Sequence, residues 1–363
     1  MKIYVYAIAK NESQFAARWA ASMGEADGMI VLDTGSTDDT AALLRARGAQ
    51  VTEEIIVPWR FDAARNRSLS LVPEDADICV CTDLDEVFQP GWRALLENAW
   101  RPGVTRASYR YTWNFLPDGR EGTVFWLDKI HARHGYRWAH PVHEVLVWEG
   151  QGEEKRITVE GMALRHHADP RKSRAQYLDL LELSVQESPE DDRNLHYLGR
   201  EYLFRGRYED CVRTLLRHLA LPTATWADER CASMRYIARS LEALGEETQA
   251  EAWRWRAVAE APHLREPYMD LAWMLYQRQD WEGVLFLTGR ALRITERPRT
   301  YITDGNAWGA LPWDLRSLAL YHTQQPDAAL AAVDQAIALD PSDQRLRDNR
   351  RLLERAAPKR GEA

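Results

Sequence analysis

The stretch Ile78-Cys79-Val80-Cys81-Thr82-Asp83-Leu84-Asp85-Glu86 joins a short apolar run to three acidic side chains. Its largely apolar, partly β-branched first half is typical of a buried strand. In an extended segment, residues two apart project to the same side, so Asp83 and Asp85 can present their carboxylates together. Mn²⁺ and Mg²⁺ prefer oxygen ligands and often complete their shells with phosphate oxygens. The stretch therefore predicts a metal–diphosphate site at the mouth of an α/β sheet.

A second pair of acids with the same spacing, Asp75-Ala76-Asp77, lies just upstream. Such a pair is also typical of a solvated acidic turn, which is the alternative to a metal site. Asp75 and Asp77 precede the predicted strand, whereas Asp83 and Asp85 follow it. Because ligands of open α/β sheets bind beyond the carboxyl ends of strands, position favours Asp83 and Asp85 as the functional pair.

The composition is that of a globular protein, with 45% hydrophobic and 28% charged residues among 363. The length predicts two domains. The formal charge of −8 makes a nucleic acid a less favoured partner. Four cysteines are few for this length and lack further clustered zinc ligands, which favours reduced thiols in a cytoplasmic protein. We expect no membrane span, because the apolar run at residues 3–9 soon reaches a charge.

Strand-like and helix-like segments alternate through the first eighty residues. The expected strands are residues 3–9, 28–32, 50–57 and 76–82, and the expected helices end near residues 23, 47 and 71. Such alternation predicts a parallel sheet with helices on its faces. No glycine-rich phosphate loop follows the first strand, which counts against NAD binding and against P-loop chemistry.

Several motifs of the first half resemble a known family. Ala7-Ile8-Ala9-Lys10-Asn11-Glu12 and Val31-Leu32-Asp33-Thr34-Gly35-Ser36-Thr37-Asp38-Asp39-Thr40 are similar to the opening of inverting GT-A glycosyltransferases of family two. Trp59-Arg60-Phe61-Asp62-Ala63-Ala64-Arg65-Asn66 and Asp83-Leu84-Asp85-Glu86 resemble a bacterial branch that carries tetratricopeptide repeats and includes peptide S-glycosyltransferases. The resemblance implies an α/β GT-A (Rossmann-like) nucleotide-sugar domain, with a UDP-sugar as the favoured donor.

The resemblance also implies roles for residues along one edge of the sheet. Asp33 would lie near the nucleotide base or ribose, and Arg65 would balance the diphosphate charge. Asp83 would contact the ribose or the metal, and Asp85 would hold the metal and belong to the catalytic residues. The other residues implied to line the donor are Ala9, Lys10, Asn11, Glu12 and Leu84. Two structural alternatives stay open: Asp33 could cap the next helix, and Arg65 could be a surface arginine.

Residues 129–144 concentrate four of the ten histidines. In GT-A enzymes a late histidine often completes the metal shell, so the resemblance makes His143 the third metal ligand. Glu144 is the candidate general base, or it orients His143. The other three histidines are better explained by packing, and Lys129 and Arg133 could bind the diphosphate. The base stays open, because the chain lacks a clear Glu-Asp pair and a Q-x-x-R-W motif.

The second half, residues 169–363, is predicted to be a helical superhelix of tetratricopeptide repeats, following a GT-A domain at residues 1–168. Small and large apolar residues recur with a nominal period of 34 residues, as in Leu198-Gly199 and Leu215 of the first unit. Small residues let paired helices approach, and large residues fill the gaps between units. The repeats could dimerise, bind a peptide or protein acceptor, or support the catalytic domain.

Three functions follow from these patterns. The leading hypothesis is an inverting, divalent-metal-dependent glycosyltransferase that moves a sugar from a nucleotide donor to an acceptor, with a peptide or protein favoured by the repeats. Nucleotidyl transfer on a related fold is the second hypothesis, although that chemistry usually has a glycine-rich basic loop where this chain has Lys10-Asn11-Glu12-Ser13. The third is a non-catalytic repeat scaffold with a decayed transferase domain.

Overall fold

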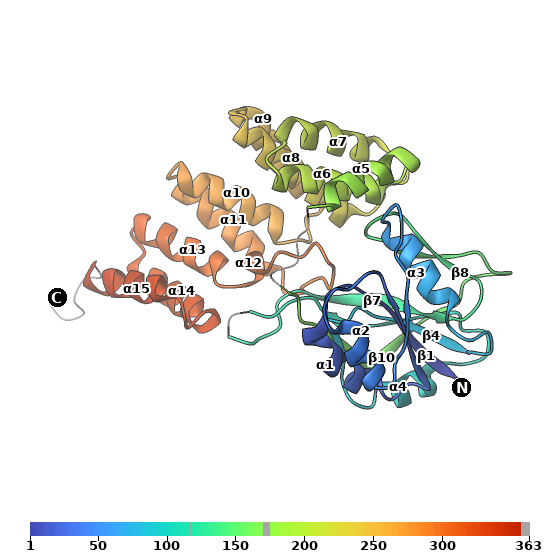
Figure 1. The fold of residues 1–363 in the computed structure, drawn as a ribbon. Coiled ribbons are helices and arrows are strands. Elements are labelled where there is room, and N and C mark those ends of the chain that lie inside the picture. Colours follow the sequence, from blue (N-terminus) through green and yellow to red (C-terminus); the bar gives the residue numbers. More distant parts are fainter. Residues whose placement is uncertain (117, 170–174, 357–363) are drawn as a thin grey trace. The chain divides into compact units, whose positions relative to one another are not determined.

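The computed structural model describes residues 1–116, 118–169 and 175–356, and these form two compact units (Figure 1). The sheet unit comprises Met1–Glu187 together with Arg299–Tyr301, and the repeat unit comprises Ser188–Pro298 and the chain from Ile302 onward. Helix α5 (Tyr177–Glu187) groups with the sheet unit. The sheet unit therefore extends past residue 168, where the sequence predicts the end of the first domain.

The sheet unit is built on eight strands in the order β3-β2-β1-β4-β7-β6-β10-β5. Four of them are parallel neighbours: β1 (Ile3–Ala9), β2 (Gly28–Asp33), β3 (Gln50–Glu53) and β4 (Ile78–Cys81). The helices that connect them are α1 (Ser13–Met23), α2 (Thr40–Ala46) and α3 (Phe61–Ser70). The predicted alternation is therefore present, with a third strand that ends four residues earlier than expected.

The remaining strands make the sheet mixed rather than wholly parallel. Strand β7 (Val124–Ala132) runs antiparallel between β4 and β6 (Arg106–Thr112). Strand β10 (Arg156–His166) is parallel to β6 and carries the edge strand β5 (Glu86–Phe88). The other elements of this part are helix α4 (Trp92–Ala99) and the hairpin of β8 (Tyr136–Ala139) and β9 (Val145–Trp148).

The two faces of the sheet bury different side chains because strand residues alternate in direction. Val5 and Ala7 of β1 belong to a core that includes Trp19 of α1 and Trp92 of α4. Tyr6, between them, belongs to a second cluster with residues of α3 and of the β8–β9 hairpin. Each fully buried large side chain contributes about 1.5–3 kcal/mol of transfer free energy. All four cysteines are buried free thiols.

The repeat unit consists of antiparallel helix pairs, which confirms the predicted helical repeats (Figure 1). The pairs are α6 (Asp192–Phe204) with α7 (Tyr208–Ala220), α8 (Ala227–Ala243) with α9 (Glu247–Glu260), α10 (Glu266–Gln277) with α11 (Trp281–Arg293), and α13 (Leu311–His322) with α14 (Pro326–Leu339). A short helix α12 (Gly305–Trp308) precedes the last pair, and α15 (Gln344–Ala356) follows it. Gly199 of α6 must be small, because a Cβ there would lie 2.3 Å from Leu215 of α7.

The first helix of each pair ends in the same way. A residue with left-handed backbone follows it, with φ of 71° at Gly206, 81° at Gly245 and 60° at both Gln279 and Gln324. The next backbone N–H then reaches back to a carbonyl five residues earlier, as from Asp280 to Leu275 at 2.9 Å. This turn satisfies carbonyl groups that the helix end leaves free. Among the helices described, none combines the length and the apolar character that a membrane span needs.

Candidate functional site

The register of the sheet brings residues from distant segments to one edge. Strands β1, β2 and β4 end there, and their order, 3-2-1-4, places a change of direction between β1 and β4, where α/β sheets bind ligands. Strand β6 ends at the same edge, because β7 runs antiparallel to both β4 and β6, and β10 ends beside it, because Thr112 pairs with Arg165. His166 is in turn the partner of Glu86 in β5. The loop with Asp83 and Asp85 therefore lies among the ends of β1, β4, β6 and β10.

Asp83 is engaged by two cations at this edge. Arg65 of α3 donates from Nη2 to its Oδ1 at 2.7 Å, and the Lys129 ammonium of β7 lies 3.3 Å from its Oδ2. Arg65 also donates from Nε to Glu144 at 2.5 Å, and its guanidinium lies over the Trp138 ring. With only 3% of its surface exposed, Arg65 is a buried link between two carboxylates rather than a surface arginine.

Charge pairing keeps this cluster ionised despite its burial. Burial alone would lower the pKa of the Arg65 guanidinium, but the carboxylates of Asp83 and Glu144 hold it well above the ordinary value. Lys129 behaves in the same way: burial lowers its pKa, and the negative charge of Asp83 more than compensates. The role of Arg65 at a diphosphate stays a prediction, since in this structure the guanidinium binds protein carboxylates.

Asp85 lies beside the imidazole of His166, a residue outside the motifs of the acidic loop and the histidine-rich segment. The Nε2 atom of His166 is 3.4 Å from the Asp85 carboxylate, and its Nδ1 is 2.8 Å from the Trp113 carbonyl. The His166 ring also stacks on Trp113. Burial would lower the pKa of His166, but Asp85 raises it above the ordinary value. The two side chains form an oxygen–nitrogen pair at the sheet edge.

His143 lies in a different setting from the one that the resemblance implied. Its backbone is left-handed, with φ of 51°, and its ring meets Tyr177 of α5 at a centroid distance of 6.0 Å. A shared metal ion would need the ligand atoms of Asp83, Asp85 and His143 to lie close together. Among the residues that the structure describes, these three do not have ligand atoms that all lie within 4.8 Å of one another. The metal role of His143 stays a prediction, and His166 is the imidazole beside Asp85.

Asp33 stabilises the turn after β2 with one carboxylate oxygen, and its role at a nucleotide stays a prediction. Its Oδ1 accepts hydrogen bonds from the backbone N–H groups of Gly35 at 2.9 Å and Ser36 at 2.7 Å, so it does fix the turn after β2. Its Oδ2 is buried, and among the described residues no donor lies within hydrogen-bond distance. A buried carboxylate oxygen without a donor costs stability, which makes it a candidate for a ligand hydroxyl or N–H.

The residues after β1 mainly tie the loops together. Asn11 adopts φ of 54°, accepts the Thr37 N–H at 2.7 Å and donates its own N–H to Ser36 at 2.8 Å. The backbone N–H of Glu12, a buried residue, donates to Thr40. The Ala9 carbonyl accepts hydrogen bonds from the backbone N–H and the hydroxyl of Thr34. Lys10 is exposed.

Leu84 differs from the expectation that it lines the donor. Its side chain is fully buried in the main core, so a ligand could meet only its backbone. Glu86 stabilises the acidic loop through two hydrogen bonds. Its carboxylate accepts one from the Asp83 N–H at 2.9 Å and one from the Tyr111 hydroxyl at 2.8 Å. Burial raises the pKa of Glu86. Both residues position Asp83 and Asp85.

Two further residues of the histidine-rich segment are structural. His131 is fully buried, with Nε2 2.8 Å from the Tyr6 hydroxyl and Nδ1 2.7 Å from the Ala132 carbonyl. Burial lowers its pKa to about 3. Arg133 donates to the carbonyls of Val72 and Pro73, which replaces its suggested diphosphate role with a packing role.

The donor set at the sheet edge fits a divalent cation. A carboxylate and an imidazole are suitable ligands for Mn²⁺ and for other transition ions, whereas Mg²⁺ favours oxygen alone. Two such ligands leave coordination positions for phosphate oxygens. Asp85 and His166 would hold the ion, and Asp83 could join only if its contacts with Arg65 or Lys129 opened.

Comparison with known proteins finds a similarity to a protein described as containing TPR repeats. This chain is 26% identical over 281 residues to a TPR repeat-containing protein of Synechococcus elongatus, a match that covers 68% of each chain. Among solved structures it is similar to Pseudomonas aeruginosa PilF (13% identity, TM-score 0.39, 48% of this chain and 72% of PilF) and to yeast Tom70 (14% identity, TM-score 0.40, 52% and 37%). The chain thus spans little more than a third of Tom70. No family model matches the chain.

Proposed function

We propose that the sheet unit binds a nucleotide sugar, with a UDP-sugar favoured, together with Mn²⁺ or Mg²⁺, and transfers the sugar with inversion to an acceptor. A peptide or protein bound by the repeats is the favoured acceptor. The observation that carries the proposal is the pair of Asp85 and His166, 3.4 Å apart, at the edge where the parallel strands end. The unpartnered Asp33 oxygen along the same edge supports it.

The charges at the edge suit the chemistry of a departing diphosphate. A metal held by Asp85 and His166 would offset the negative charge that develops on the leaving group. Asp33 would accept a hydrogen bond from the base or ribose through its free oxygen. Glu144 is the proposed proton acceptor, and this role requires its contact with Arg65 to open.

Nucleotide and metal binding give a direct test. We expect UDP to raise the melting temperature of the full chain only when Mn²⁺ is present, and Asp85→Asn to abolish this increase. Asp75→Asn is the matched control, because Asp75 belongs to the upstream acidic pair and is largely exposed. A metal-independent response to UDP, or undiminished hydrolysis of the donor by Asp85→Asn, would contradict the proposal. Pyrophosphate release from a nucleoside triphosphate and a sugar phosphate would indicate nucleotidyl transfer instead.

A repeat scaffold without turnover is the second candidate. The relative from Synechococcus elongatus is described as a TPR repeat-containing protein, and Asp83 is already paired with Arg65 and Lys129. The repeat unit also has a cavity of about 350 Å³, lined by charged groups such as Arg239 and Asp270. A panel of sugar nucleotides separates the two functions: release of UDP from any of them supports transfer. Peptide binding without release from any donor supports the scaffold.

A further inference from the structure

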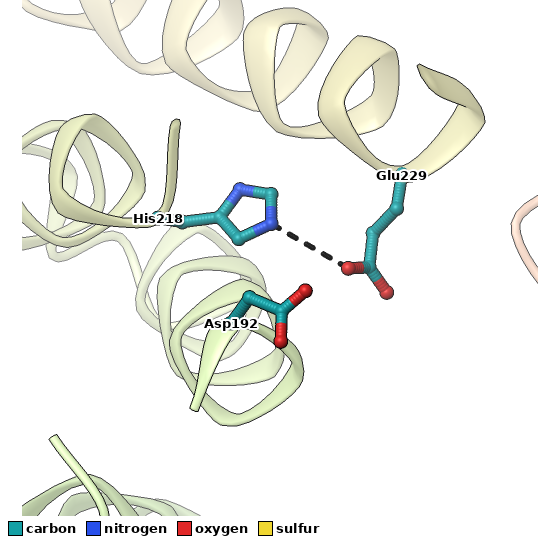
Figure 2. Close-up of side chains that lie close together, drawn as sticks. All are labelled: Asp192, His218 and Glu229. Carbon is teal, nitrogen blue, oxygen red and sulfur yellow. Dashed lines mark ion pairs between the residues drawn. The ribbon is translucent and has the colours of Figure 1, made fainter. Parts of the chain in front are cut away.

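Three side chains of types that can bind a metal ion converge inside the repeat unit. They come from three successive helices: Asp192 from the first turn of α6, His218 from the last turn of α7, and Glu229 from the first turn of α8. One ligand atom from each lies within 4.8 Å of the other two. Figure 2 shows the imidazole and the two carboxylates facing the same space.

His218 supplies an independent observation at this place. Its side chain is fully buried, and its Nε2 has no hydrogen-bond partner among the described residues. This atom points toward the Glu229 carboxylate at 3.5 Å (Figure 2). A buried ring nitrogen without a partner is uncommon, because it forfeits its hydrogen bond to water. The nitrogen is therefore available to a ligand that lies between it and the carboxylate.

The separation of these two atoms fits two ligands of one ion better than a hydrogen bond. Hydrogen bonds from nitrogen to oxygen span about 2.7–3.2 Å. Two atoms bound at about 2.1 Å to a tetrahedral zinc ion lie about 3.4 Å apart. The observed 3.5 Å between His218 and Glu229 is close to this second value. The Asp192 carboxylate, at the half-buried start of α6, has an oxygen within 4.8 Å of a ligand atom of each of the other two residues.

One of the two proton arrangements around His218 leaves its Nε2 available to a metal. The Nδ1 of His218 is 3.0 Å from the Ser233 hydroxyl, which lies 2.8 Å from Nδ1 of His196. A serine hydroxyl has one proton, so it can accept from one of these rings and donate to the other. With His218 donating from Nδ1 to Ser233, its Nε2 presents a lone pair toward Glu229. Metal-binding histidines typically donate their other N–H in this way.

We propose that Asp192, His218 and Glu229 bind one Zn²⁺ ion, with water in the fourth position. The imidazole favours zinc over Mg²⁺ or Ca²⁺, and two carboxylates balance the charge of the ion. The ion would fasten α6, α7 and α8, which belong to the first two helix pairs. This site is separate from the one at Asp85 and does not depend on sugar transfer.

Zinc titration of the full chain after treatment with a chelator tests the site. Isothermal titration calorimetry should give saturable Zn²⁺ binding that His218→Gln and Asp192→Asn each weaken by roughly 100-fold or more. Ser233→Ala should weaken it by about 10–100-fold, as the loss of a hydrogen bond behind a ligand does. Asp85→Asn should bind Zn²⁺ as tightly as the wild type, which distinguishes the zinc site from the candidate site at the sheet edge. His263→Gln is the control, because His263 is an exposed histidine that pairs with Asp228 at 2.8 Å.

Cobalt provides a second, spectroscopic measurement that does not rely on the heat of binding. Co²⁺ in a tetrahedral site absorbs visible light strongly, and we expect this signal in the wild type and in His263→Gln but not in Asp192→Asn. Asp192 is half-buried at a helix start, so Asp192→Asn decides the question if His218→Gln does not fold. Zinc binding of equal strength in the wild type and Asp192→Asn, or no saturable binding by the folded wild type, would overturn the proposal.

Discussion

Arg65 in the sheet unit and Arg235 in the repeat unit are both buried guanidinium groups, with 3% and 5% of their surfaces exposed, yet their partners differ. Arg65 bridges Asp83 and Glu144, which come from a loop and from the segment before β9. Arg235 of α8 pairs with Asp270 of α10 at 2.7 Å. One cluster collects residues that are far apart in sequence, and the other joins helices of neighbouring repeats.

The balance of charge also differs between the two clusters. In the sheet unit one guanidinium serves two carboxylates, and Lys129 assists only at Asp83. In the repeat unit Asp270 has a second cation, because Arg239 lies one helical turn beyond Arg235 and approaches it to 3.1 Å. Arg235 also lies 3.6 Å from the carboxylate of Asp304, but that side chain is 32% exposed, whereas the side chain of Glu144 is 10% exposed. Helical periodicity therefore gives Asp270 a reserve charge, and among the described residues Glu144 has no such second cation. This difference makes the Arg65 cluster the more sensitive one.

The largest expected effect is that of Arg65→Met. Removal of the guanidinium leaves Glu144, which is 10% exposed, without its cation, so we expect a loss of about 3–5 kcal/mol in unfolding free energy. Urea denaturation measures the loss. Arg67→Met on the same helix is the control, because Arg67 is 40% exposed and its ion pair with Glu54 should be worth less than about 1 kcal/mol. Equal losses for the two variants would contradict this account of Arg65.

Arg235→Met should cost less than Arg65→Met. Arg239 continues to neutralise Asp270, so we expect a loss of about 2 kcal/mol. The charge reserve predicts that Arg235→Met/Arg239→Met loses more than the sum of the two single variants, and a double-mutant cycle in urea measures this coupling. If the loss in the double variant equals the sum of the losses in the two single variants, Arg239 does not compensate for the missing charge of Arg235.

The third prediction concerns pH and a buried imidazole of the sheet unit. Because the pKa of His131 is lowered to about 3, the folded chain binds fewer protons than the unfolded chain between pH 6.5 and 3. The contribution of the neutral His131 side chain to the unfolding free energy is therefore fully present above pH 6.5. It is lost as the pH falls, and the loss reaches about 2 kcal/mol at pH 5. His131→Gln should remove this part of the pH dependence, as measured by urea denaturation from pH 8 to pH 5.

The repeats offer the same test at a second position. Burial also lowers the pKa of His196 to about 3, so His196→Gln should flatten the pH dependence of the repeat unit to a similar extent. His134→Gln is the control, since His134 is exposed. An unchanged slope in His131→Gln would mean that other groups cause the loss at low pH.

The sequence was sufficient for elements defined by local pattern. The first strand was expected at residues 3–9 and is found at Ile3–Ala9, because its apolar run is bounded by charge. The repeats were visible because each unit buries its own small and large residues at fixed spacing. The core position of Leu84 could also have been predicted, since an extended segment that points Asp83 and Asp85 one way points Leu84 the other.

The partners within the site could not be read from the sequence. His166 meets Asp85 because β10 pairs with both β6 and β5, and the β6–β10 register shifts between Thr158 and Ala163. A shift of this kind changes which residue arrives at the edge, and no local pattern fixes it. The link from Arg65 to Glu144 likewise spans 79 residues. The only sequence signal for His166 was its place at the end of a strand.

The smallest expected effect distinguishes a left-handed residue in a loop at the sheet edge from left-handed residues that only end helices. Gln279→Gly should raise the unfolding free energy by about 0.5–1 kcal/mol, because glycine adopts the left-handed conformation without a Cβ clash. Asn11→Gly relieves a similar φ but loses the hydrogen bond that the Thr37 N–H donates to Asn11 Oδ1, so it should bring no gain. Gln277→Gly, at the last residue of α10, should destabilise the chain by less than about 1 kcal/mol, because glycine is a poorer helix former than glutamine. Thermal unfolding of the three variants ranks them, and a gain in Asn11→Gly as large as that in Gln279→Gly would show that its bond to Thr37 contributes nothing.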